Sequence, residues 1–238
     1  MKKHLLTILC IVLSLKSANS QNNTNSTNLP ADMIRIEASH VTIGNDQGFE
    51  NEKPAFKTHI KAFLLDKNVV TVGQFRMFVK VNGYITEAEK KGEGLAYDQE
   101  NNEWKSIAGA NWEYPLGKDK EKAKNNEPVR QVSWNDAKAY ATWLGKRLPS
   151  EFEMEYAMTQ TEKTGIKMLD GSIWQWCETP YVKYDEGSYY KKVVLEKSIK
   201  GGSIIIDNQK ISRPSLRDAC VSDLATYQIG FRCAKNIE

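Results

Sequence analysis

The sequence predicts an α+β domain built from short strands, two or three helices and much irregular chain. Three observations support this fold class. Apolar residues alternate over short stretches near both ends of the chain, with the two-residue period of a strand. Helix start and stop residues flank three segments in the middle of the chain. The segments between them are rich in Gly, Asn, Lys and Glu, which favour turns and loops.

The first elements are strands followed by a helix. Residues 33–46 alternate apolar and polar positions and predict short strands. Residues 51–67 combine a charged, proline-containing turn with a second strand pattern. A helix begins at Thr71 and ends at Gly83, because its apolar residues fall on one face and glycine supplies a helix stop.

The clearest local signals are two capping boxes. Ser133 followed by Asp136 opens a helix that ends at Gly145, and Ser150 followed by Glu153 opens another. In each case a side-chain oxygen satisfies a backbone N–H that the first helical turn leaves unpaired. Beyond them the chain predicts short, turn-rich strands within residues 171–181, 193–206 and 227–235.

A polar stretch separates the first helix from the capping boxes. Residues 86–126 predict an irregular excursion that Trp104, Trp112 and Tyr114 pin to the domain. Trp134 and Trp143, on or beside an amphipathic helix, are expected in the core.

The N-terminus predicts export. Residues 1–20 combine a basic start, an apolar run of 11 residues and small residues near a cleavage point, as a signal peptide does. That run is too short to span a bilayer, so no transmembrane segment is expected. Residues 21–31 are Asn-rich and predict a flexible tether, which leaves residues 32–236 as one domain. We expect a periplasmic or secreted protein.

The apparent positive charge belongs to the signal peptide. The chain has 33 basic and 30 acidic side chains. Its first 20 residues hold three lysines and no acidic residue, so the remainder is balanced. A nucleic-acid partner is therefore not predicted.

Three cysteines remain after the signal peptide: Cys177, Cys220 and Cys233. An oxidising compartment allows one disulfide among them and leaves one thiol over. No CxxC pair is present, and His40 and His59 are the only histidines left, so no zinc site of the Cys/His type is expected.

Several segments together resemble the formylglycine-generating enzyme (sulfatase-modifying factor) family. They occur in the family's order at residues 51–75, 83–90, 127–157, 171–177, 200–203 and 229–235. The most specific of them reads VSWNDAKAY and GKRLPSEFEMEYA. The resemblance implies a C-type-lectin-like fold with short strands and few helices.

The resemblance also shows what this chain has lost. In formylglycine generators two cysteines, at the third and eighth positions after the GGS motif, bind copper(I) and convert a sulfatase cysteine into formylglycine. Those positions are Ile206 and Ile211 here, and neither can bind a metal. Soft thiolates suit copper(I), whereas the nearby oxygen-bearing side chains do not. No cofactor is predicted.

Two further departures concern calcium and disulfides. The family usually carries some tens of residues, including calcium-binding loops, where this chain has only residues 159–170, and Ser172 replaces the family's asparagine, so calcium is not supported. Ala141 stands where relatives have a cysteine that pairs with the equivalent of Cys233. Cys233 is left with Cys177 or Cys220 as a partner, or as a buried thiol.

Five residues are candidate ligand contacts: Trp174, Trp176, Ser203, Arg213 and Arg217. The two tryptophans read either as core and rim aromatics or as a groove wall. Both arginines read either as structural partners of Glu153 or Asp136 or as groups that grip a carboxylate ligand. No histidine neighbours Ser203, so a serine nucleophile is not predicted, and no residue is proposed as catalytic.

The sequence therefore favours an exported pseudoenzyme that serves as a structural or ligand-binding module. Its partner would be a protein, peptide or glycan. The alternative is an oxidoreductase of altered chemistry acting on a peptide or small molecule through the same groove. Retention of the GGS motif, the paired tryptophans and the arginines motivates that alternative.

Overall fold

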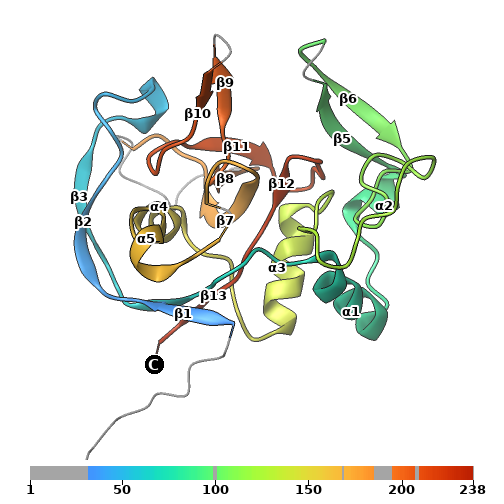
Figure 1. Ribbon diagram of the computed structural model, residues 1–238, viewed down its shortest axis with the longest axis horizontal. Coiled ribbons are helices and arrows are strands. Elements are labelled where there is room, and N and C mark those ends of the chain that lie inside the picture. The colour runs from blue at the N-terminus through green and yellow to red at the C-terminus, as the bar shows by residue number, and fades with distance from the viewer. Residues whose placement is uncertain (1–31, 99–100, 168, 185–194, 207–208, 238) are drawn as a thin grey trace, which may run out of the picture.

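The computed structural model describes residues 32–98, 101–167, 169–184, 195–206 and 209–237 (Figure 1). The expected signal peptide and tether, residues 1–31, lie outside this part. Within it, no helix combines the length and apolar character needed to cross a bilayer. Helices and short strands are mixed throughout, which confirms the predicted α+β class.

The strands are short and form several small sheets. β4 is the centre of the sheet β1–β4–β13, while β8 and β7 are the inner strands of β11–β8–β7–β12. Three two-stranded pairs complete the strand structure: β2–β3, β5–β6 and β9–β10. The bounds are β1 Met33–Ile36, β2 Ser39–Ile43, β3 Phe56–Ile60, β4 Phe63–Asp66, β5 Glu93–Asp98, β6 Glu103–Ala108, β7 Trp174–Pro180, β8 Glu196–Lys200, β9 Ile204–Ile206, β10 Gln209–Ile211, β11 Asp218–Val221, β12 Ile229–Gly230 and β13 Ala234–Asn236.

The helices begin where the sequence predicts. Thr71, Ser133 and Ser150 each accept a hydrogen bond from the backbone N–H three residues on, which confirms the expected caps. Gly83 ends the first helix in the left-handed conformation, with φ +59°. The helical elements are α1 Val72–Asn82, α2 Glu87–Lys91, α3 Trp134–Trp143, α4 Glu151–Thr159, α5 Thr161–Thr164 and the 3-10 turn η1 Glu50–Glu52.

The stretch from 86 to 126 is more regular than the sequence predicts. It forms α2 and the β5–β6 hairpin, because Thr86 caps α2 and the strands pair in continuous register. Trp112 is buried and packs against Phe75 with ring centroids 5.7 Å apart, as expected of an anchor. Trp104, however, is 55% exposed on β6, so it does not pin this segment.

The core lies in two parts. One gathers around α1 and α3 and includes Phe75, Tyr140 and Trp176. The other lies between α4 and the sheet that contains β4 and includes Phe63 and Met154. The first cluster includes Trp176 of β7 and Ile229 of β12, so both strands are anchored in the core.

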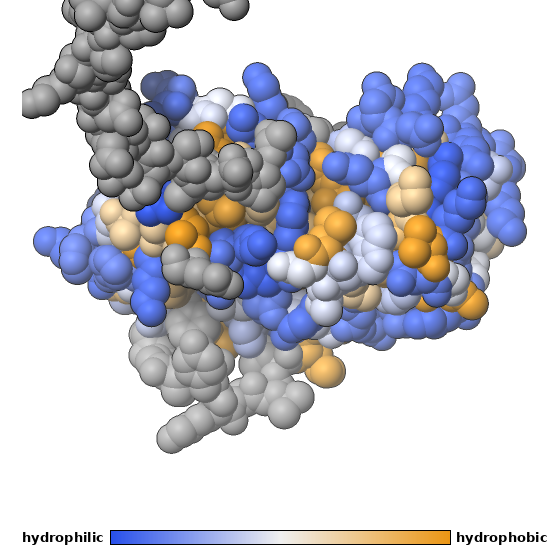
Figure 2. Space-filling model, turned by 90° about the horizontal axis from the view of Figure 1, so that it is seen from below, coloured by the Kyte–Doolittle hydropathy of each residue, from blue (hydrophilic) through white to orange (hydrophobic). Residues whose placement is uncertain are grey.

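One predicted core residue lies at the surface. Trp143 is 38% exposed at the end of α3, since the helix ends there and only part of the indole packs against Phe78. Trp134 is half-buried, and its indole N–H donates to the Cys177 carbonyl at 2.8 Å. The face seen from below is mainly hydrophilic, with hydrophobic patches standing among the polar side chains (Figure 2).

Candidate functional site

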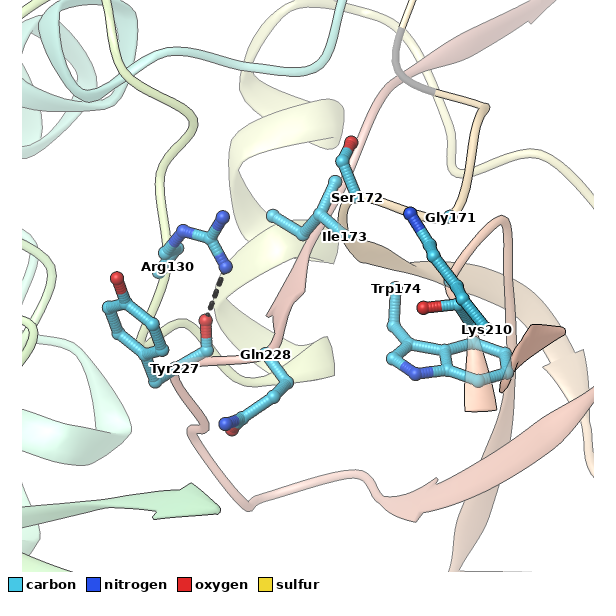
Figure 3. A pocket seen from close by; sticks show the side chains of 10 residues that line it. Arg130, Gly171, Ser172, Ile173, Trp174, Lys210, Tyr227 and Gln228 are labelled. Atoms are coloured by element: carbon cyan, nitrogen blue, oxygen red, sulfur yellow. Dashed lines mark hydrogen bonds between the residues drawn. The ribbon is translucent and has the colours of Figure 1, made fainter. Parts of the chain in front are cut away.

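A pocket of about 390 Å³ opens where five separate segments of the chain meet. The loop into β7 forms one wall with β10, and the segment before β12 forms the opposite wall with Arg130 (Figure 3). Ile173 lies between these walls (Figure 3). The lining residues are Arg130, Gly171, Ser172, Ile173, Trp174, Gly202, Ser203, Lys210, Tyr227 and Gln228.

Gly202 determines where Trp174 lies. A Cβ atom added to Gly202 would come within 2.2 Å of the indole ring, far inside van der Waals contact. The ring therefore rests directly against the Gly202 backbone, which only glycine allows. The second glycine of the GGS motif thus places an aromatic wall of the pocket.

Arg130 provides a charged group on the opposite wall. Its Nη1 donates to the Tyr227 carbonyl at 2.7 Å, and its guanidinium carbon lies 4.8 Å from the centre of the Tyr227 ring (Figure 3). No carboxylate of the described residues comes within 4 Å of this guanidinium. Burial lowers the pKa of Arg130, although nearby Tyr227 and Glu127 partly offset this effect, and the group stays charged at neutral pH.

Lys210 provides a second cation, from β10. Its Nζ donates to the Asp170 carbonyl at 3.3 Å, and its side chain is exposed. The Asp170 carboxyl lies close by, and hydrogen bonds from Ser172, together with the Lys210 charge, lower its pKa. Each cation therefore has an acidic side chain in its electrostatic surroundings, Glu127 for Arg130 and Asp170 for Lys210, but they differ in exposure, since Arg130 is half-buried and Lys210 is exposed.

The structure brings two of the five candidate residues to the pocket, Trp174 and Ser203. Trp176 lies elsewhere, because it points into the core and its indole N–H donates to the Val132 carbonyl at 3.0 Å. Residues two apart on a strand share a face, so the two tryptophans differ in depth: Trp174 is half-buried at the start of β7, whereas Trp176 is completely buried.

The two arginines after β10 also lie away from the pocket. Arg217 is buried and forms an ion pair with Glu151, with Nε 2.5 Å from Oε1. Arg213 pairs with the fully buried Glu52, with Nε 2.9 Å from Oε2. Both arginines thus have structural carboxylate partners.

The prediction that Arg213 and Arg217 pair with Glu153 or Asp136 is wrong. Glu153 pairs instead with Arg147, at 2.7 Å, beside the start of α4. The Asp136 carboxylate accepts a hydrogen bond from the Ser133 N–H at the start of α3 and another from the Tyr84 hydroxyl, at 3.0 Å. Each acid three residues after a capping serine is held by its own helix start, which leaves other acids for Arg213 and Arg217.

The two positions that the resemblance assigns to the family's copper ligands lie on the β9–β10 hairpin. Ile206 pairs across it with Gln209, and Ile211 pairs with Ile204. Neither Ile204 nor Ile206 lines the pocket, so these side chains do not fill it. The donor set that would hold copper(I) is not formed by these hydrocarbon side chains.

The three cysteines do not replace that donor set. Cys177 and Cys233 are completely buried, and burial raises the pKa of both thiols. Burial also raises the pKa of Cys220, to about 12. All three are free thiols, none lines the pocket, and the described residues contain no cluster of three or more His, Cys, Asp or Glu side chains able to hold a metal.

Sequence reasoning missed Arg130, Lys210, Tyr227 and Gln228. They come from three distant segments, and none has the spacing of a recognisable motif. Only Arg130 had a signal in the sequence, because it lies within residues 127–157, a segment that carries the family resemblance, and three residues before the N-cap of α3.

Comparison with known proteins identifies the family. The family described as "Sulfatase-modifying factor enzyme 1-like domain" matches residues 18–165 and 160–237. The chain belongs to this family. The two matched segments meet in the short connection after α4, where the family was expected to carry additional residues.

Curated relatives agree with the family match. The formylglycine-generating enzyme of Bos taurus is 40% identical over 147 residues, which are 54% of this chain and 39% of that protein. The enzyme of Mycobacterium tuberculosis is 25% identical over 85% of this chain and 97% of its own length. The inactive C-alpha-formylglycine-generating enzyme 2 of Bos taurus is 34% identical over 60% of this chain and 52% of that protein. The chain thus spans about two fifths of the length of the first of these relatives.

Solved structures confirm the fold of the sulfatase-modifying factor family. PvdO from Pseudomonas aeruginosa superposes with a TM-score of 0.65 at 18% identity, over 86% of this chain and 94% of that one. Treponema denticola variable protein 1 superposes with a TM-score of 0.57 at 14% identity, over 86% and 95% of the two chains.

Proposed function

We propose that this chain is a ligand-binding member of the sulfatase-modifying factor family that does not perform copper-dependent cysteine oxidation. The observation that carries the proposal is the pair Ile206 and Ile211 at the positions of the copper thiolates. Hydrocarbon side chains there cannot bind copper(I) or activate oxygen through it. The name of one relative, an inactive formylglycine-generating enzyme, supports the idea that the family fold serves without this activity.

The pocket supports a binding role. It is lined by two aromatic rings, two cations and several neutral polar groups from separate segments, which resembles the mixed lining of ligand sites. Its walls are built on glycine contacts and on a domain core, so they are positioned before any ligand arrives. Export of the protein, expected from residues 1–20, would place this pocket in an extracytoplasmic compartment.

An anaerobic copper(I) titration against a chromogenic chelator tests the proposal. We expect the wild-type chain to withdraw no stoichiometric copper from the chelator. A variant with Ile206→Cys and Ile211→Cys restores two thiols on one hairpin and should withdraw about one equivalent. Capture of one equivalent of copper(I) by the wild type would refute the proposal.

A further inference from the structure

We propose that the pocket binds an anionic sugar, with the anionic group at Arg130 and the ring against Trp174. This inference rests on the proposed binding function and adds the chemical class of the ligand. It depends on three properties of the pocket: an unpaired cation, an aromatic surface held in place, and neutral polar groups between them.

The charge argument concerns Arg130. A partly buried guanidinium has lost part of its hydration, and among the described residues no carboxylate pairs with it within 4 Å, so the Glu127 charge acts on it only from a longer distance. Its bond to the Tyr227 carbonyl uses Nη1 and leaves the other N–H groups of the fork available. A carboxylate or phosphate would accept two of them side by side, which is the geometry that arginine favours.

Lys210 reinforces this preference from the opposite wall. It lies across the pocket from Arg130, so an anion between them would feel both charges (Figure 3). Its contribution is smaller, because it is exposed and Asp170 lies nearby. The pocket is therefore electropositive even though the exported part of the chain carries no net charge.

The shape argument concerns Trp174. Its indole rests against Gly202 and cannot retreat without leaving that contact, so it offers a fixed flat surface. The C–H groups on one face of a sugar ring pack well on such a surface, since an aromatic face carries partial negative charge. A flat surface also fits an aromatic acid, and the polar residues of the pocket distinguish that ligand from a sugar.

Polar groups favour a sugar over an aromatic acid. Ser172, Ser203 and Gln228 line the same pocket as the two rings. The hydroxyl of Ser203 has no hydrogen-bond partner among the described residues. A ligand with several hydroxyl groups can use such donors and acceptors, whereas an aromatic acid would leave them unsatisfied.

The test is an NMR titration of the exported chain with D-glucuronate, D-glucose and glucose 6-phosphate. The indole N–H signal of Trp174, assigned by its loss in Trp174→Phe, reports binding. D-glucose differs from D-glucuronate only at C6, so it is the neutral match. We expect the charged sugars to shift this signal with millimolar Kd values and D-glucose to leave it unmoved at the same concentrations.

Variants then locate the anion. Arg130→Gln should raise the Kd for D-glucuronate about tenfold, and Arg130→Lys should restore part of the affinity. Lys210→Gln should raise the Kd for D-glucuronate about threefold. Lys61 is exposed and lies outside the pocket, so Lys61→Gln should leave this Kd unchanged. The proposal is overturned if no charged sugar shifts the signal, or if D-glucose binds as well as D-glucuronate. It is also overturned if an acetylated aspartate amide binds more tightly than either charged sugar. Equal Kd values in Arg130→Gln and Lys61→Gln would overturn the assigned position of the anion. Copper capture would contradict the proposed function without changing these sugar results, so the two failures are distinguishable.

Discussion

Individual charged residues hold this domain together from inside. Arg217 and Glu151 are both buried, and the guanidinium also lies over the rings of Tyr181 and Tyr184, at 4.4 and 4.0 Å. Ser198 donates to the same carboxylate at 2.6 Å. Such a network is costly to break because the surviving charge would stay buried.

Arg217→Met should therefore destabilise the fold strongly. It leaves the Glu151 carboxylate buried without its charged partner, which costs about 3–5 kcal/mol of unfolding free energy. Urea unfolding measures this change. The matched control Arg35→Met breaks an exposed pair with Glu37 and should cost about 1 kcal/mol or less. Equal losses in the two variants would show that the buried pair has no special role.

Glu52 makes stability depend on acid pH. Burial alone would raise the pKa of this carboxyl, but hydrogen bonds from Arg213 and Ser215 and the Arg213 charge lower it overall. A lowered pKa in the folded state stabilises the fold above the ordinary value of 4.5, and this contribution is lost as pH falls through the lowered pKa.

Glu52→Gln removes that titration. We expect the variant to lose about 1–3 kcal/mol of unfolding free energy at pH 7 and less at pH 3, because the contribution of Glu52 in the wild type declines as pH falls below 4.5 toward the lowered pKa. Urea unfolding of both proteins at the two pH values gives the difference directly. A gap that widens on acidification would contradict the assigned sign.

The helix starts of this fold are determined by the local sequence, whereas other elements depend on tertiary contacts. The capping boxes at Ser133 and Ser150 could be predicted because hydroxyl and acceptor stand three residues apart in the sequence, and Thr71 could be predicted as a helix start. The β5–β6 hairpin could not be predicted, since β6 is exposed along most of its length and β5 buries only the small residues Gly94 and Ala96. Polar strands lack the alternation by which a strand is recognised.

The site was predictable to the same limited degree. Trp174 and Ser203 belong to contiguous family motifs, so sequence order identified them. Arg130 and Lys210 line the same pocket only because the fold brings β10 and the segment before α3 to its two sides. Trp176 and Arg217 lie away from this pocket, because sequence alone does not tell how deeply a side chain is buried or which buried acid it meets.

Gly202→Ala tests how elements shape the pocket. The new Cβ would overlap the Trp174 indole, so the ring must move and the fold should lose about 1–3 kcal/mol. The indole N–H shift of Trp174 and urea unfolding report the two effects. Ser203→Ala adds no atom and should leave the ring in place. An unmoved Trp174 in Gly202→Ala would show that the glycine contact does not position it.

At the scale of the whole molecule, the family fold is retained, while isoleucines occupy the two positions that the resemblance assigns to the copper thiolates. The two-part core includes residues of β7 and β12, and the buried pair of Arg217 and Glu151 joins the start of β11 to α4. The remaining thiols have raised pKa values, so little reactive thiolate exists at neutral pH. The molecule therefore presents a preformed, electropositive pocket without a thiolate pair beside it.

Mass spectrometry of a cysteine-containing peptide, incubated with the protein, copper(I) and oxygen, tests this account most directly. We predict that the peptide's cysteine is recovered as the thiol or its disulfide, as in a parallel reaction without the protein. Conversion of that cysteine to formylglycine, dependent on the protein, on copper and on oxygen, would contradict it.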